Sequence, residues 1–131
     1  MVIDTSALVA IQLRETSCDV LLAAIVRGSK RMVASISLLE AGMVLRARAG
    51  KSAVPLLYEL IDTLGIEIVP FDAAHAQVAI AAFERFGKGV GHQAQLNFGD
   101  CAVYAVAALR GDSILAAGKD FAATDLTVVN F

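Results

Sequence analysis

Short apolar stretches, each suited to one buried strand, alternate with longer helix-forming stretches along the whole chain. Strands are predicted at segments 1–4, 32–35, 66–71 and 113–118, with a last short one at 126–130. Helices are predicted between them at segments 5–13, 17–28, 37–50, 52–65, 72–87 and 96–110. Apolar strands that alternate with helices are typical of a parallel sheet covered on both faces. The expected fold is therefore α/β, a three-layer α/β/α sandwich with a short, mostly parallel central sheet.

The length of 131 residues suits a single domain over residues 1–131. Hydrophobic residues make up 57% of the chain and the mean hydropathy is +0.67, which favours a well-filled core and an apolar surface for oligomerisation. Charges interrupt every apolar run well short of the ~20 residues of a membrane-spanning helix. The first ten residues do not resemble a leader, and Cys18 and Cys101 have no metal-binding spacing. A cytoplasmic protein with reduced thiols and no membrane segment is predicted.

Two acidic residues fall where a parallel sheet usually carries its site, beyond the carboxyl ends of the strands. Asp4 ends the first predicted strand, and Asp120 follows the predicted strand 113–118. Each has a simpler explanation, because an aspartate after a strand often caps a helix or sits in a turn. Thr5 or Ser6 are further candidates for the cap of helix 5–13. Taken one at a time, these acids leave both explanations open.

Two further acids lie on predicted helices that are otherwise apolar. Asp100 shares a helix face with Val103 and Tyr104, and it also fits the third position of a capping box that begins at Asn97. Glu40 lies about one turn into helix 37–50, where capping does not explain it and no basic residue follows three or four positions on. The remaining simple explanation for Glu40 is an exposed position on the helix rim.

Taken together, the four acids predict a metal site. An unpaired charge in an apolar interior is costly, so it must be neutralised, paired or bound to a cation. Four carboxylates that converge from four elements repel one another unless a divalent cation lies between them. Because no histidine or cysteine accompanies them, Mg²⁺ or Mn²⁺, as one or two ions, fits better than Zn²⁺.

Four motifs in this order resemble those of the PIN-domain ribonucleases, and most closely the VapC toxins of bacterial toxin–antitoxin pairs. They are VIDTSALVAI at the start, SLLEAGMVL in the middle, LNFGDCAVYAVAA later and LAAGKDFAATDL near the end. The resemblance extends from residue 1 to about residue 128 and implies the PIN-like form of the sandwich described above. It also implies an acidic quartet that holds the metal, made here of Asp4, Glu40, Asp100 and Asp120.

The fourth member of the quartet has two candidates in the last motif. Asp120 directly follows the strand and is favoured, while Asp125 in the Thr-Asp pair competes for the same role. The family also implies a supporting hydroxyl beside the metal, at Ser6. Asp4, Glu40 and Asp100 are expected to hold the principal ion, and Asp120 to hold a second ion or to orient water.

Such a site is expected to hydrolyse RNA phosphodiesters, leaving a 5′-phosphate and a 3′-hydroxyl because a metal-activated water attacks. The resemblance implies a toxin that cleaves tRNA or ribosomal RNA, a homodimer, and a VapB-type antitoxin whose C-terminal segment crosses the acidic site. Without the four site acids, the 11 basic residues outnumber what remains of the 13 acidic ones. The candidates for binding the RNA backbone are Arg46, Arg48, Lys51, Arg85, Lys88 and Lys119.

Two other functions stay open at the level of the sequence. A receiver-like phospho-acceptor domain also has a parallel sheet, acids at strand ends and Mg²⁺, but it usually carries paired acids after the first strand and a lysine after the last. Here Asp4 is followed by Thr5, and Lys119 precedes an aspartate. A catalytically inert PIN-like binding module is the second alternative, which the intact quartet disfavours.

Overall fold

Four short parallel strands form the single sheet of the computed structural model, which describes residues 1–131. The strands are β1 (Val2–Ile3), β2 (Met32–Ala34), β3 (Glu67–Val69) and β4 (Ile114–Leu115). Their spatial order is β3-β2-β1-β4, and Val2 of β1 pairs with both Met32 of β2 and Ile114 of β4. Because parallel neighbours require crossover connections, helices pass over the sheet between successive strands.

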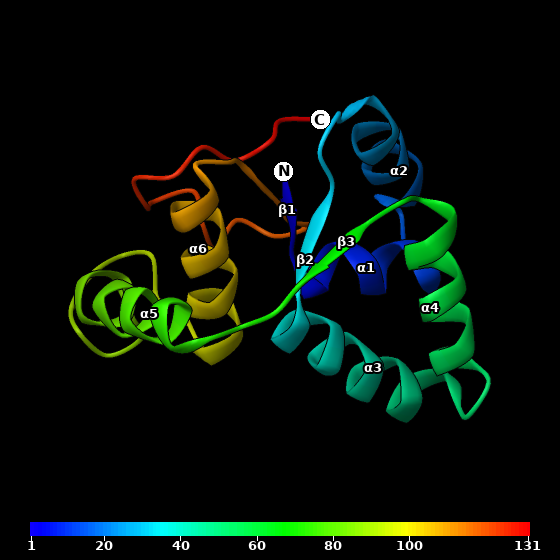
Figure 1. The fold of residues 1–131 in the computed structure, drawn as a ribbon, viewed down its shortest axis with the longest axis horizontal. Helices are drawn as coiled ribbons and strands as arrows, with labels where there is room; N and C mark the ends of the chain where they lie inside the picture. The colour runs from blue at the N-terminus through cyan, green and yellow to red at the C-terminus, as the bar shows by residue number, and fades with distance from the viewer.

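Six helices connect and flank the strands (Figure 1). They are α1 (Thr5–Gln12), α2 (Cys18–Arg27), α3 (Ser35–Ala49), α4 (Ala53–Thr63), α5 (Ala73–Phe86) and α6 (Phe98–Arg110). Local signals set several of their ends. Asp72 accepts the backbone N–H of His75 to cap α5, and Gly111 ends α6 in the left-handed conformation that glycine tolerates best.

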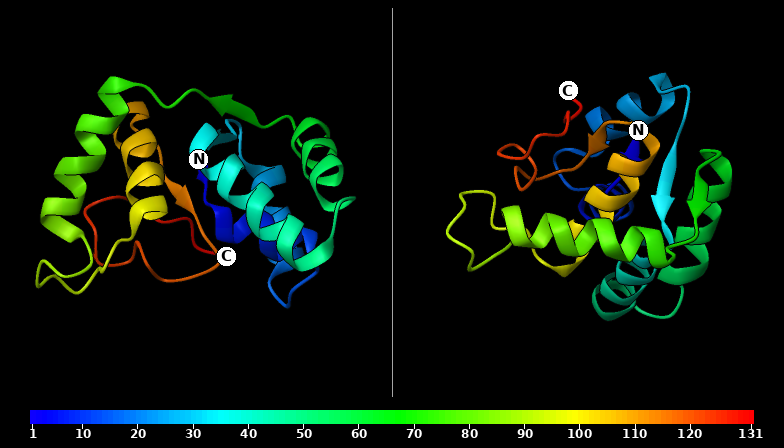
Figure 2. Two further views of the ribbon diagram at one scale, coloured as in Figure 1. Left: turned by 90° about the horizontal axis from the view of Figure 1, so that it is seen from below. Right: turned by 60° about the vertical axis from the view of Figure 1, so that its left-hand side comes forward.

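The two faces of the sheet carry separate hydrophobic cores. Successive side chains of a strand point to opposite faces, so Ile3 packs with α1 to α4 while its neighbour Val2 packs with α5 and α6. Seen from below, α5 and α6 lie on one side of the strands and α1, α3 and α4 lie on the other (Figure 2). This arrangement confirms the predicted three-layer α/β/α sandwich.

Two local predictions were wrong. The segment 126–130 does not form a strand, because only Val128 makes an isolated bridge, to Ile114 on the outer strand β4. The cap of α1 is Asp4, whereas Thr5 and Ser6 already lie inside the helix. The remaining predicted strands and helices are present with shorter or shifted ends.

The carboxyl ends of the strands meet at one edge of the sheet, the lower edge in Figure 1. β1 leads into α1 there and β2 leads directly into α3, while the first turn of α6 approaches from the other side. Asp4, Glu40 and Asp100 are thus all carried to this edge. None of the helices is both long and apolar enough to cross a bilayer.

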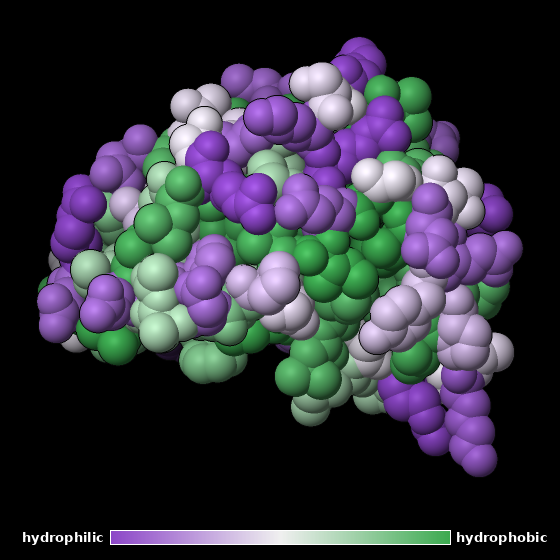
Figure 3. Space-filling model, in the orientation of Figure 1, coloured by the Kyte–Doolittle hydropathy of each residue, from purple (hydrophilic) through white to green (hydrophobic).

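Apolar side chains also reach the surface. Figure 3 shows hydrophobic residues across the middle of one face, between more polar regions. The most exposed large apolar side chains are Phe98 on α6, Met43 and Leu39 on α3, and Ile80 on α5. Because monomeric proteins rarely leave such residues grouped in the open, these surfaces are candidates for contact with other chains.

Candidate functional site

Asp4 lies between β1 and α1 and is only 6% exposed. Its Oδ2 accepts the backbone N–H of Ser6 at 2.9 Å and the Ser6 hydroxyl at 2.5 Å. Burial raises the pKa of the Asp4 carboxyl above its usual value, and the hydrogen bonds from Ser6 partly oppose that rise. Because Oδ2 alone accepts both bonds from Ser6, the other carboxylate oxygen of Asp4 is left for a second role. Asp4 can therefore cap α1 and also take part in a site.

The Ser6 hydroxyl joins Asp4 to the segment that carries Asp120. Ser6 Oγ donates to Asp4 and accepts the Ala117 N–H at 3.1 Å, a contact between residues 111 positions apart. Ala117 lies in the segment between β4 and Asp120. The hydroxyl predicted at Ser6 is therefore beside the acids, and its bond to Ala117 is a connection that the sequence did not reveal.

Asp100 occupies the third position of α6 and closes a capping box with Asn97. Asn97 Oδ1 accepts the Asp100 N–H at 2.9 Å, and Asp100 Oδ2 accepts the Asn97 N–H at 2.9 Å. Asp100 is only 8% exposed. The capping explanation of Asp100 is thus confirmed, and it fixes one carboxylate oxygen while the other stays available.

Glu40 on α3 lies against the first turn of α6. Its carboxylate packs directly on Gly99, where a Cβ atom would overlap the carboxylate oxygen Oε2. Glu40 is half-buried rather than fully exposed on a rim. Gly99 was not among the predicted site residues, although a glycine inside the first turn of a helix is a visible signal because glycine disfavours helices.

The four predicted acids interact electrostatically across this edge. Burial is the largest cause of a rise in the pKa of Asp100 from 3.8 to about 6, and the negative charges of Asp4, Asp120 and Glu40 add to it, while the Asn97 N–H opposes it. Asp120 also contributes to the raised pKa of Asp4. Asp100 therefore lies within electrostatic range of the three other predicted acids, which come from separate parts of the chain.

The structure separates the two candidates for the fourth acid. Asp120 is exposed and within electrostatic range of both Asp4 and Asp100. Asp125 instead accepts the Tyr104 hydroxyl at 2.7 Å and pairs with Arg85 at 3.3 Å. Tyr104 and Arg85 hold the pKa of the Asp125 carboxyl below its usual value. Asp125 thus serves to attach the C-terminal segment to α5 and α6.

The donor chemistry of the cluster fits a hard divalent cation. None of the ion pairs in the structure includes any of the four acids, so their charges have no cationic side-chain partner. No three His, Cys, Asp or Glu side chains lie close enough to share one ion directly. Mg²⁺ keeps several waters and commonly binds through one or two carboxylates. The acids therefore fit an ion held partly through water, whereas direct binding by three of them requires side-chain movement.

The basic residues proposed for RNA binding are all exposed, but two of them are already paired. Arg48 lies 3.5 Å from Glu15, and Arg85 pairs with Asp125 and stacks on the ring of Phe86. Lys119 directly precedes Asp120. The three others lie elsewhere, Arg46 near the end of α3, Lys51 in the turn after it, and Lys88 in the loop after α5.

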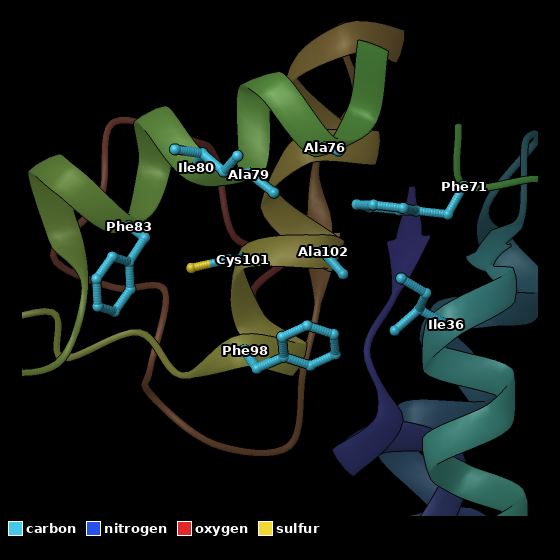
Figure 4. A pocket seen from close by; sticks show the side chains of 9 residues that line it. All are labelled: Ile36, Phe71, Ala76, Ala79, Ile80, Phe83, Phe98, Cys101 and Ala102. Carbon is cyan, nitrogen blue, oxygen red and sulfur yellow. The ribbon is translucent and has the colours of Figure 1, made fainter. Parts of the chain in front are cut away.

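A pocket of about 350 Å³ is lined by apolar side chains alone, among them Phe98 and Cys101 near Asp100 in the chain, and by none of the acids (Figure 4). Its walls come from α5, α6 and the start of α3, and its rings are Phe71, Phe83 and Phe98. Cys101 lines it, so this thiol faces away from the acid of the preceding residue. With no polar side chain in its walls, the pocket suits an apolar surface of another chain rather than the charged acid chemistry.

Comparison with known proteins identifies the family. The PIN domain matches residues 1–126 of this chain. Ribonuclease VapC36 of Mycobacterium tuberculosis is 42% identical over 127 residues, covering 96% of this chain and 91% of its own. Ribonuclease VapC of Mycolicibacterium smegmatis is 38% identical over 130 residues, covering 99% of this chain and 100% of its own.

Solved structures share the fold. The M. tuberculosis toxin VapC20, described as cleaving the sarcin–ricin loop, superimposes with a TM-score of 0.78 at 19% identity, covering 99% of this chain and 98% of that one. FitAcB from Neisseria gonorrhoeae gives a TM-score of 0.71 at 20% identity, with 98% and 96% covered. These matches leave no support for the receiver-like alternative. The chain belongs to the PIN-domain family, and within it to the VapC ribonucleases.

Proposed function

We propose that this protein is a metal-dependent endoribonuclease that acts as the toxin of a toxin–antitoxin pair. The observation that carries the proposal is that Asp4 and Asp100 are buried and anchored to helix starts, with Glu40 packed on the residue before Asp100, and that none of these acids has a basic partner. A cluster of this kind favours a divalent cation. The 36–42% identity to VapC ribonucleases supports the same activity for this chain.

Two of the acids are held in place for binding Mg²⁺ or Mn²⁺. Ser6 fixes one oxygen of Asp4 and the Asn97 N–H fixes one oxygen of Asp100, which leaves the other oxygen of each for an ion. When bound, the ion lowers the pKa of a water and neutralises charge on the phosphate in the transition state. Glu40, next to Asp100, would complete the coordination of that ion directly or through water, and Asp120 would hold a second ion or orient water.

The RNA backbone is expected to approach the exposed rim next to Asp120. Lys119 directly precedes Asp120 in the sequence and so is the basic residue nearest to it along the chain. Arg46, Lys51 and Lys88 have no carboxylate partner that would compete with a phosphate. Arg48 and Arg85 must first leave Glu15 and Asp125 to contribute. The substrate class that we propose is tRNA or ribosomal RNA.

Two protein partners belong to the proposal. An antitoxin segment with basic side chains is complementary to the unpaired acids, and one structural neighbour is a toxin–antitoxin complex from Klebsiella pneumoniae, with a TM-score of 0.75 at 15% identity. A second copy of this chain is the proposed cover for the apolar side chains around the pocket, among them Ile80 and Phe98. A monomer mass in sedimentation equilibrium at micromolar concentration would contradict the homodimer.

RNA cleavage by the purified protein is expected only with a divalent cation. With Mg²⁺ or Mn²⁺ present, structured RNA is cut to fragments with a 5′-phosphate and a 3′-hydroxyl, since water is the nucleophile. EDTA abolishes the cleavage and added metal restores it. Gel analysis of end-labelled RNA, with phosphatase treatment to identify the ends, measures this. Cleavage that persists in EDTA, or 2′,3′-cyclic phosphate ends, would contradict the proposal, and no cleavage of any RNA would favour the inert binding module.

Asp120 and Asp125 are expected to differ when each is changed to Asn. Asp120→Asn lowers the cleavage rate by about tenfold or more, because it removes an exposed negative charge within electrostatic range of Asp4 and Asp100. Asp125→Asn leaves the rate close to wild type but lowers the melting temperature, because it weakens the contacts with Tyr104 and Arg85. Single-turnover cleavage and calorimetric melting separate the two effects. The reverse pattern would assign the fourth role to Asp125.

A further inference from the structure

The contact between Glu40 and Gly99 joins α3 to the first turn of α6. A Cβ at position 99 would overlap Glu40 Oε2 and lie 3.1 Å from Cδ and 3.3 Å from Oε1. All three nearest atoms belong to the Glu40 carboxylate, and none belongs to backbone or to the core. Gly99 is buried, so the carboxylate fills the space that a side chain would otherwise take.

The backbone does not require glycine at this position. Gly99 is not among the glycines with positive φ, and it lies in regular helix, where alanine is intrinsically more favourable. The N–H groups of Phe98 and Gly99 are at the N-terminus of α6, where negative charge is stabilised. The missing side chain therefore has one structural consequence, which is room for a carboxylate at the start of α6.

We propose that Gly99 is a positioning residue, because the space left by its missing side chain holds the Glu40 carboxylate on the first turn of α6, next to Asp100. We call this contact between Gly99 and the Glu40 carboxylate the seat. The seat sets the direction in which Glu40 points from α3, a helix that lies close to α6. Asn97 fixes Asp100 in the same turn, so one helix start orients two acids from different parts of the chain. The catalytic consequence rests on the proposed function, whereas the seat itself does not.

The test is Gly99→Ala, with Gly42→Ala as the matched control. Gly42 lies on α3 two residues from Glu40, and nothing is within 4 Å of its Cβ position. Gly99→Ala is expected to fold, because only the mobile end of Glu40 must move. Its affinity for Mn²⁺ in titration calorimetry and its RNA cleavage rate are each expected to fall by about 10- to 100-fold. Gly42→Ala is expected to match wild type in both.

A shorter acid at position 40 supplies the rescue. In the Gly99→Ala background, Glu40→Asp withdraws the carboxylate by one methylene, so it is expected to recover part of the lost Mn²⁺ affinity. In the wild-type background the same change is expected to lower that affinity. Wild-type Mn²⁺ affinity in Gly99→Ala, or equal effects of Glu40→Asp in both backgrounds, would overturn the proposal.

Thermal melting in EDTA keeps the seat testable without metal or RNA. If Gly99→Ala lowers the melting temperature, adding Glu40→Ala is expected to restore it, because the overlapping carboxylate is then absent. A loss that Glu40→Ala does not restore would overturn the proposal. Failure of wild-type protein to cleave RNA would instead remove the proposed function, while the coupling between positions 99 and 40 in melting still decides the seat.

Discussion

Asp100→Asn is expected to abolish RNA cleavage and growth arrest while leaving the protein folded. Asp100 is buried, anchored by Asn97 and within electrostatic range of the other acids, so its loss is expected to weaken metal binding more than the loss of the exposed Asp120. A contribution of about 4 kcal/mol to transition-state stabilisation corresponds to a rate loss of roughly 10³-fold. Asparagine keeps the size of the side chain and an oxygen that can accept the Asn97 N–H, so α6 stays capped.

The assay compares wild type with Asp100→Asn in induced cultures and in cleavage of purified RNA with Mg²⁺. Asp62→Asn is the matched control, because Asp62 is exposed on α4 and takes part in no ion pair. The control is expected to arrest growth like wild type. Equal toxicity and equal cleavage by wild type and Asp100→Asn would rule out this acid as the centre of the site.

Asp100 is expected to contribute less to the stability of the metal-free protein as the pH rises from about 4 to about 6. Its carboxyl has a folded-state pKa of about 6 against 3.8 for the usual value, so the folded state binds the proton more tightly than the unfolded state. The stabilisation that protonated Asp100 gives to the folded state is therefore fully present below about pH 4 and lost above about pH 6. Allowing for solvent screening, it amounts to about 1–2 kcal/mol of unfolding free energy.

Urea unfolding of wild type and Asp100→Asn in EDTA isolates this contribution. Other acids act in the opposite direction, since the pKa of Asp112 and of Asp125 is lowered in the fold, so the informative quantity is the difference between the two proteins. In EDTA the variant is expected to gain stability relative to wild type between pH 4.5 and pH 7.5. Mg²⁺ at pH 7.5 is expected to stabilise wild type more than the variant. A difference that does not change with pH or with Mg²⁺ would contradict both the raised pKa and the metal site.

Local explanations and functional explanations turned out to apply to the same residues. Asp4 caps α1 and Asp100 closes a capping box in α6, as local patterns of the sequence predict. Capping uses one oxygen of each carboxylate and anchors it to a helix start, which orients the second oxygen. The simple explanation of each acid therefore describes how the fold holds it, and does not compete with its place in the cluster.

The sequence by itself determined the order of strands and helices, the parallel sheet, and the acids at its carboxyl edge. Each strand and helix follows from a hydrophobic pattern and capping residues that lie within a few positions of one another. The alternation of strands with helices along the chain then predicts the parallel sheet. Only the tertiary structure decided that Asp120 lies within electrostatic range of Asp4 while Asp125 pairs with Tyr104 and Arg85.

The Glu40 carboxylate on Gly99 and the Ser6 hydroxyl on Ala117 were likewise decided by the tertiary structure. So was the reduction of segment 126–130 to a single bridge at Val128. Each of these contacts joins residues far apart in the chain. Their geometry depends on how α3, α6 and the segment after β4 pack against the same edge of the sheet, and no local pattern encodes that packing.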